Sequence, residues 1–137
     1  MTFRIATWNI NSVRLRIDLV CKLLKNEDID VLCLQECKSP VEKIPLDVFS
    51  ENGFPHLVAR GQKGYNGVAI VSKFPLREKS AIDFAGLGHA RYIAAQLENG
   101  ITIHNFYVPA GGDEPDRKKN EKFDQKLNYL SEMKDYF

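Results

Sequence analysis

The chain has 137 residues, of which 44% are apolar and 27% charged, and its formal net charge is +1. This length and composition are ordinary for one globular domain, and the near-neutral charge excludes a strongly basic, nucleic-acid-coating protein but not a local basic patch. No apolar run reaches the roughly 20 residues of a transmembrane helix, and the N-terminus lacks a signal-peptide-like apolar stretch. We predict one domain over residues 1–137 with no membrane partner.

The cysteines favour a reducing compartment. Cys21, Cys33 and Cys37 are odd in number, and two of them lie in apolar stretches, which is not typical of a disulfide framework. No further cysteine or histidine lies near Cys33 and Cys37, whereas a zinc site normally needs four ligands. We expect free thiols, no zinc and a cytoplasmic location.

The first 35 or so residues predict a β-α-β unit. Segment 3–10 is rich in β-branched and aromatic residues and favours a strand, and the apolar residues of 13–25 recur at helical spacing. The continuous apolar run 30–35 is typical of a strand buried on both faces, as in a parallel sheet. The crossover between the two strands should be right-handed.

Shorter elements follow this unit. Helices are expected at 46–51 and 120–137, and strands at 56–59, 68–72, 92–97 and 101–108. Asn99-Gly100 separates the last two strands and favours a type I′ hairpin turn, which needs two residues at positive φ. A β-α-β unit combined with antiparallel strands predicts an α/β fold with one mixed β-sheet flanked by helices.

Two polar residues follow the strands of the β-α-β unit. Asn9 and Glu36 each come at the carboxyl end of a predicted strand, and ligands gather at that edge in open α/β sheets. A carboxylate beside an amide oxygen suits a hard cation such as Mg²⁺. By themselves the residues leave a second interpretation open, in which Glu36 is a solvated loop acid and Asn9 a turn residue.

Later segments carry groups that could contact a phosphate. Tyr107 ends a strand, and Asn105 lies two residues earlier on the same strand face. The glycine-rich segment 61–67 could bring backbone N–H groups and Lys63 close to an anion, and Arg91 could clamp one. Each of these residues also has a purely structural interpretation, as a sheet tyrosine, a hairpin turn or a surface arginine.

Four segments occur in an informative order: Thr7-Trp8-Asn9-Ile10-Asn11-Ser12-Val13-Arg14, Leu34-Gln35-Glu36-Cys37-Lys38, Gly61-Gln62-Lys63-Gly64-Tyr65-Asn66-Gly67-Val68-Ala69-Ile70 and Asn105-Phe106-Tyr107-Val108-Pro109. They resemble motifs of the endonuclease/exonuclease/phosphatase superfamily, and the third is closest to the exonuclease III and abasic-site endonuclease branch. The resemblance implies half of the DNase I-like four-layer α/β sandwich. It also implies Mg²⁺-dependent hydrolysis of phosphodiesters, with Mn²⁺ as an alternative ion, in duplex DNA with abasic sites or 3′ ends.

The resemblance also implies roles for individual residues. Glu36 would be the metal-binding carboxylate, with Asn9 beside the metal, and Tyr107 would be the catalytic residue at the scissile phosphate. The substrate-binding candidates are Asn11, Lys38, Arg91 and Asn105.

The family's later motifs have no counterpart in the chain. A G-D-x-N motif follows the family's equivalent of the helix that ends at Phe137, and a further aspartate and an S-D-H motif come after it. Gly112-Asp113-Glu114-Pro115 begins like G-D-x-N, but a proline replaces the asparagine, and the segment precedes the last helix. We therefore expect an N-terminal half that is inactive alone, because general acid/base help is often worth about 10²–10⁴-fold.

Such a half would leave one sheet face exposed, and exposed apolar faces mark interfaces. A C-terminal half chain or self-association is expected to cover it. Two alternatives remain open: a non-catalytic remnant or subunit completed by a partner chain, and another phosphodiesterase or phosphatase of the superfamily.

Overall fold

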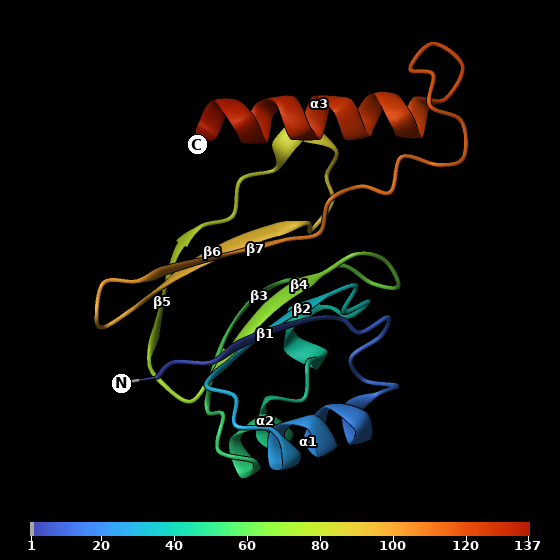
Figure 1. Cartoon of the computed structure of the whole chain (residues 1–137). Helices are drawn as coiled ribbons and strands as arrows, with labels where there is room; N and C mark the ends of the chain where they lie inside the picture. The colour runs from blue at the N-terminus through green and yellow to red at the C-terminus, as the bar shows by residue number, and fades with distance from the viewer. Residues whose placement is uncertain (1) are drawn as a thin grey trace.

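The computed structural model describes residues 2–137 as four layers (Figure 1). Helices α1 and α2 lie on one face of a four-stranded sheet, a three-stranded sheet packs on the other face, and helix α3 lies outermost. The helices are α1 (Ile17–Asn26), α2 (Leu46–Glu51) and α3 (Glu121–Tyr136), with short 3₁₀ helices η1 (Val41–Lys43) and η2 (Phe84–Gly86). The strands are β1 (Ile5–Asn9), β2 (Val31–Gln35), β3 (His56–Arg60), β4 (Val68–Ser72), β5 (Leu76–Ser80), β6 (Tyr92–Leu97) and β7 (Thr102–Phe106).

The four-stranded sheet is mixed, as predicted. Its order is β1-β2-β4-β3, with β1 parallel to β2 and the other pairs antiparallel. The central strand β4 is buried at every residue because both faces of the sheet are covered. Toward the helices, Leu32, Leu34 and Val71 pack with Val20 of α1 and Phe49 of α2.

The second sheet corrects the expectation of one sheet with an exposed face. Strands β5-β6-β7 form an antiparallel sheet of their own. Ile93 and Ile103 on its inner face pack against Val68 and Ile70, so the chain covers this face of the mixed sheet itself. Strand β5 escaped prediction because its middle residues are charged and exposed, as an edge strand tolerates.

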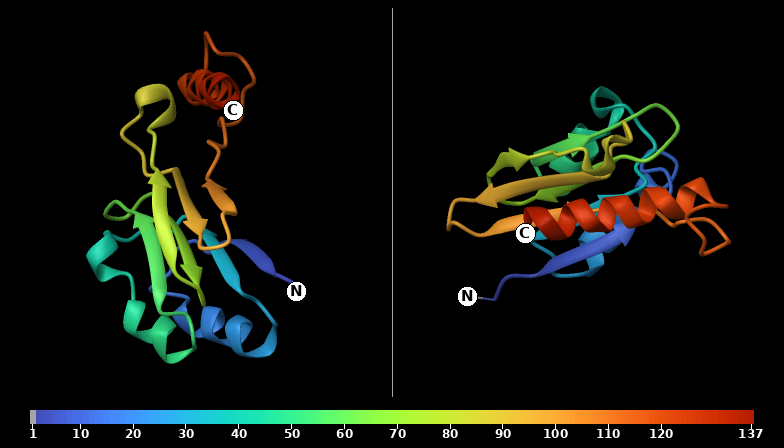
Figure 2. Two further views of the ribbon diagram at one scale, coloured as in Figure 1. Left: turned by 90° about the vertical axis from the view of Figure 1, so that its left-hand side faces the viewer. Right: turned by 90° about the horizontal axis from the view of Figure 1, so that it is seen from above.

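Helix α3 covers the outer face of the second sheet (Figures 1 and 2). Tyr129 of α3 is 1% exposed and packs with Phe84, Tyr92 and Ala94, and the Phe84 and Tyr129 rings lie 5.4 Å apart. The predicted C-terminal helix is therefore present and is bound through aromatic contacts. None of the helices formed by residues 2–137 combines the length and apolar character needed to span a bilayer.

Two local expectations were wrong in detail. The β6–β7 hairpin forms, but at its turn only Gly100 has a positive φ, of 89°, so the turn is not type I′. Helix α1 begins at Ile17 rather than near residue 13. The reason is that Ser12 and Val13 donate their backbone N–H groups to Glu36 O and Cys37 O, at 2.8 and 3.1 Å, instead of opening the helix.

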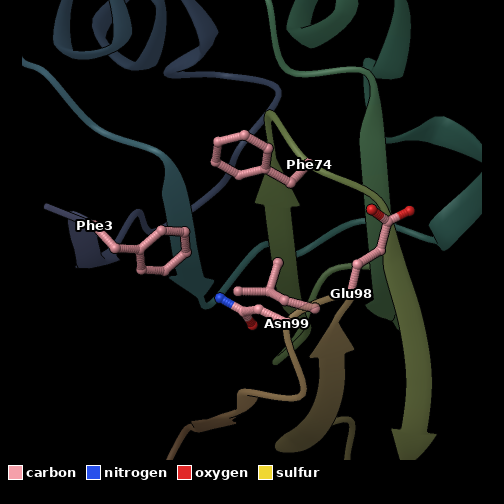
Figure 3. A pocket seen from close by; sticks show the side chains of 5 residues that line it. Phe3, Phe74, Glu98 and Asn99 are labelled. Carbon is pink, nitrogen blue, oxygen red and sulfur yellow. The ribbon is translucent and has the colours of Figure 1, made fainter. Parts of the chain in front are cut away.

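A small apolar pocket lies at the end of the sheets where β1 begins (Figure 3). It measures about 170 Å³ and is lined by Phe3, Phe74, Leu97, Glu98 and Asn99. Asn9 is the last residue of β1 and Glu36 directly follows β2, both at the opposite ends of these strands, so this pocket is separate from the candidate site.

Candidate active site

The carboxyl ends of β1 and β2 meet at one edge of the mixed sheet. Asn9 is the register partner of Gln35, the residue before Glu36. Just beyond, Ile10 N–H donates to Gln35 O at 3.0 Å, so the two chains stay together past the strands. Neighbouring strands lie about 4.8 Å apart, which places Asn9 and Glu36 at the same edge. No hydrogen bond joins their side chains in the structure of residues 2–137.

Backbone strain is concentrated at this edge. Six residues other than glycine have positive φ within 2–137, and five of them lie here: Asn11, Ser12, Glu36, Lys38 and Asn66. Such a conformation costs roughly 1–2 kcal/mol per residue and persists only where surrounding contacts hold it, which is typical of functional sites. Here the loops hold one another, because Lys38 N–H donates to Asn66 O at 2.8 Å and Cys37 N–H to Gly67 O at 3.0 Å.

Tyr107 reaches this edge from the other sheet. Its hydroxyl donates a hydrogen bond to Glu36 Oε1, and both residues are half-buried. Burial raises the pKa of Tyr107, and the hydrogen bond and negative charge of Glu36 raise it further, whereas Arg91 lowers it. The phenol is therefore protonated at neutral pH and acts as a hydrogen-bond donor.

Arg91 is fixed beside Tyr107 rather than free on the surface. Its guanidinium lies over the Tyr107 ring, 4.6 Å from the centroid, and its Nη1 donates to Tyr107 O at 3.3 Å. Its Nε donates to His89 Nδ1 at 3.2 Å. Burial and then Arg91 lower the pKa of His89, so the imidazole is neutral and can accept this bond. Sequence reasoning gave His89 no role, because only the fold brings it against Arg91.

Asn11 and Lys38 form a second polar pair at the same edge. Lys38 Nζ donates to Asn11 Oδ1 at 2.6 Å, and Arg16 Nη1 donates to Asn11 O at 2.6 Å. Two cations therefore lie near the exposed Asn11 side chain. Such a group can attract the phosphates of a nucleic acid.

The glycine-rich segment 61–67 borders the site and exposes Tyr65, which is 73% accessible. Gln62 attaches the segment to the approach to β6, because its Oε1 accepts from Asn66 Nδ2 at 2.8 Å and from Ala90 N–H at 2.9 Å. Lys63 is also exposed. The segment is therefore held at its base and open to solvent at its tip.

Asn105 does not suit the substrate contact expected from its position. It is 2% exposed, and its Nδ2 donates to Leu34 O at 3.0 Å and to Ala69 O at 2.8 Å. Its Oδ1 accepts from Gln35 Nε2 at 2.7 Å, and Gln35 Nε2 also donates to Thr7 Oγ1 at 2.9 Å. Residue 105 faces the mixed sheet, where no substrate can reach. Both amide hydrogens and the amide oxygen of Asn105 are therefore paired within the protein. The sequence alone assigned no role to Gln35 or Thr7, although both lie in segments that resemble the superfamily motifs.

The groups at this edge suit a hard metal ion better than a soft one. Glu36 offers a carboxylate and Asn9 an amide oxygen, a set that fits a divalent cation retaining several waters. No cluster of three or more His, Cys, Asp and Glu residues able to hold a metal occurs within residues 2–137. Burial raises the pKa of Cys33 to about 11 and that of Cys37 to about 12, so these free thiols stay protonated and are poor ligands.

Comparisons with known proteins agree on one family. The profile of the endonuclease/exonuclease/phosphatase family matches residues 6–134. Exodeoxyribonuclease III of Haemophilus influenzae is 29% identical, and the match covers 95% of this chain and 49% of that protein. The chain thus spans about half the length of this curated relative.

Solved structures show the same relationship. An AP endonuclease from Archaeoglobus fulgidus superposes with a TM-score of 0.85 and 36% identity, over 96% of this chain and 49% of that one. A 3′ phosphatase from Neisseria, solved with a product DNA hairpin, gives a TM-score of 0.80 and 34% identity, over 95% and 49%. The four layers therefore match about half of each of these solved chains, as the expected half-sandwich requires.

Proposed function

The chain belongs to the endonuclease/exonuclease/phosphatase family, and we propose that it provides the metal-binding and phosphate-binding part of a DNA phosphodiester hydrolase. The observation that carries this proposal is the meeting of Glu36 with Tyr107 from opposite sheets, with the Arg91 cation over the tyrosine ring. A carboxylate, a protonated phenol and a cation at one strained sheet edge suit a phosphate diester and a hard cation together.

Each group has a defined task in this proposal. Glu36, with the amide oxygen of Asn9, would hold Mg²⁺ or Mn²⁺, and the bound ion supplies positive charge toward the phosphate. The Tyr107 hydroxyl, which donates to Glu36 in the free chain, would turn its single proton to a non-bridging phosphate oxygen when the substrate binds, where negative charge builds during hydrolysis. Arg91 adds positive charge behind the tyrosine, and Lys38 with Asn11 binds the flanking DNA backbone.

Proton transfer is the part of the chemistry that these residues do not supply. Within residues 2–137, neither Glu36 nor Tyr107 is hydrogen-bonded to an aspartate or histidine side chain that could move protons of an attacking water. General acid/base help is often worth about 10²–10⁴-fold in rate. We therefore expect this chain by itself to bind DNA ends or abasic sites without cutting them efficiently. A partner chain that completes the site remains the alternative assembly.

Binding of defined duplexes tests the proposal. Fluorescence anisotropy with Mg²⁺ would compare four ligands: a duplex with an abasic analogue, a duplex with a 3′ phosphate, an intact blunt duplex, and a phosphodiester lipid headgroup. The two modified duplexes are included because the relatives comprise an AP endonuclease and a 3′ phosphatase. We expect tighter binding to at least one of them than to the intact duplex, and weakening of that preference by Arg91→Met and Glu36→Gln.

The matched control is Glu98→Gln, which removes one exposed carboxylate at the small pocket on the opposite end of the sheets. Its preference should equal that of the unchanged protein. Equal affinity for all three duplexes, or a preference for the lipid headgroup, would contradict a DNA-directed site. Efficient Mg²⁺-dependent incision that Glu36→Gln abolishes would show that the chain alone already handles the protons.

A further inference from the structure

Three polar residues link strands of both sheets immediately beneath the candidate site. Asn105 on β7 donates to Leu34 O of β2 at 3.0 Å and to Ala69 O of β4 at 2.8 Å. Gln35 Nε2 donates to Asn105 Oδ1 at 2.7 Å and to Thr7 Oγ1 of β1 at 2.9 Å. We call Thr7, Gln35 and Asn105 the amide clamp.

The amide clamp is an unusual feature of an otherwise apolar interface. Around Asn105, the facing sheets pack through residues such as Val68, Ile70, Ile93 and Ile103. An amide buried there is costly unless every donor and acceptor is paired. Asn105 meets this condition, since both Nδ2 hydrogens have carbonyl acceptors and Oδ1 accepts from Gln35. An apolar side chain would fill the same space equally well. What the amide adds is a set of directional hydrogen bonds, which fix how the strands are aligned.

The spacing along the strands shows which side chains these hydrogen bonds align. Glu36 lies two residues beyond Leu34, and Tyr107 lies two residues beyond Asn105. A strand advances about 3.3 Å per residue, so equal offsets carry Glu36 and Tyr107 to the same level. Leu34 itself faces the helices, and the positive φ of Glu36, 53°, takes the Glu36 side chain out of the strand alternation and toward Tyr107. The contact between Asn105 and Leu34 O therefore sets the register in which Tyr107 meets Glu36. Figure 1 shows β7 lying above β2 and β4.

The same offset applies to the third strand. Asn9 lies two residues beyond Thr7, and Thr7 is bound to the clamp through Gln35. Four strands, β1, β2, β4 and β7, are thus joined at one level, and the three central site candidates lie at the next level. We propose that Gln35 and Asn105 are positioning residues that hold Tyr107 against Glu36, and through Thr7 keep Asn9 aligned with them. The importance of this alignment for hydrolysis rests on the proposed function, whereas the alignment itself does not.

The test reads the Tyr107 hydroxyl directly at constant neutral pH, without metal or DNA. The ζ-carbon resonance of ¹³C-labelled tyrosine responds to hydrogen bonding of the phenol. The chain has five tyrosines, so Tyr107→Phe identifies the Tyr107 signal, and the other four serve as internal references. Glu36→Gln then defines the shift produced when the carboxylate acceptor is lost.

We expect Asn105→Ala and Gln35→Met to move the Tyr107 signal in the direction of Glu36→Gln, by at least half of that displacement. The matched control is Ile103→Ala, which loosens the same sheet interface two residues from Asn105 but breaks no clamp hydrogen bond. All variants are compared under conditions where circular dichroism shows them folded. In Ile103→Ala the Tyr107 signal should stay at its original position.

An unmoved Tyr107 signal in folded Asn105→Ala and Gln35→Met would overturn the proposal, and so would an equal displacement in Ile103→Ala. If Asn105→Ala does not fold, Gln35→Met decides alone, because residue 35 is only half-buried at a strand end and the substitution preserves its length. A failure of DNA binding would count against the proposed function and leave this result standing.

Discussion

Gly67 lies where the glycine-rich segment enters β4, and an alanine there should disturb the loop that carries Glu36. Its φ is +96°, and an added Cβ would lie 3.2 Å from Cys37 Cβ and 3.4 Å from Lys38 N. The neighbour cannot easily move away, because Cys37 N–H is bound to Gly67 O at 3.0 Å and Cys37 O accepts from Val13 N–H at 3.1 Å. Gly67→Ala therefore combines backbone strain with crowding.

The magnitude follows from these two terms. Positive φ costs an alanine roughly 1–2 kcal/mol, offset by about 0.4–1 kcal/mol from the stiffer unfolded chain. Crowding of a packed position adds about 1–3 kcal/mol. We expect Gly67→Ala to lower the free energy of unfolding by about 2–4 kcal/mol. Gly64 has a similar φ of +77° with nothing within 4 Å of the added Cβ, so Gly64→Ala should pay only the strain, about 1 kcal/mol.

Equilibrium unfolding in urea, followed by the fluorescence of the single tryptophan, Trp8, measures both changes. The midpoint should fall further for Gly67→Ala than for Gly64→Ala, with unchanged denaturant dependence. Equal losses for the two variants would refute the crowding argument, and with it the close packing of the segment against Cys37.

Three further predictions follow from burial and protonation. Phe84→Ala should cost about 3–5 kcal/mol in unfolding free energy and increase proteolysis of α3, since Phe84 joins that helix to the second sheet; an unchanged cleavage pattern would count against this packing. His104 is exposed, but its contacts with Tyr92 and Phe137 partly desolvate the ring and lower its pKa below the usual 6.5. The neutral form therefore makes a modest contribution to stability above pH 6.5, and this contribution is lost as the pH falls through the folded value. His104→Gln should therefore flatten the fall in melting temperature below pH 6.5, and an unchanged slope would contradict it. Cys33 and Cys37, with pKa values raised to about 11 and about 12, should react with a thiol reagent at pH 8 only as fast as the chain unfolds.

Much of the fold could be predicted from local pattern. The β-α-β unit, the β6–β7 hairpin and α3 have strong local signals, and the ends of each element lie within four residues of the expected limits. The division of the strands between two sheets could not be predicted, because neither the apolar character of β6 nor the alternation of buried and exposed residues in β7 says what covers their faces. Strand β5 has the composition of a loop and is held by its pairing with β6.

The site was partly predictable for a related reason. Strand ends and ordered motifs pointed to Asn9, Glu36 and Tyr107, and the fold brings Glu36 and Tyr107 into direct contact. Asn105 was expected to contact substrate because the sequence places it on the same strand face as Tyr107. The sequence does not show that this face packs against the mixed sheet at residue 105. Gln35 could not be singled out, since its role depends on a contact with a residue 70 positions away.

Metal binding beside Tyr107 is the most direct test of the proposed site. Mn²⁺ is a paramagnetic replacement for Mg²⁺ and broadens nearby ¹³C resonances of labelled tyrosine. We predict that the Tyr107 signal broadens at Mn²⁺ concentrations that leave Tyr136 sharp, because Tyr136 lies on α3 at the outer side of the second sheet. Excess Mg²⁺ should restore the Tyr107 signal, and Glu36→Gln should abolish the selectivity. Equal broadening of both signals, or selective broadening that persists in Glu36→Gln, would contradict a metal site built on Glu36.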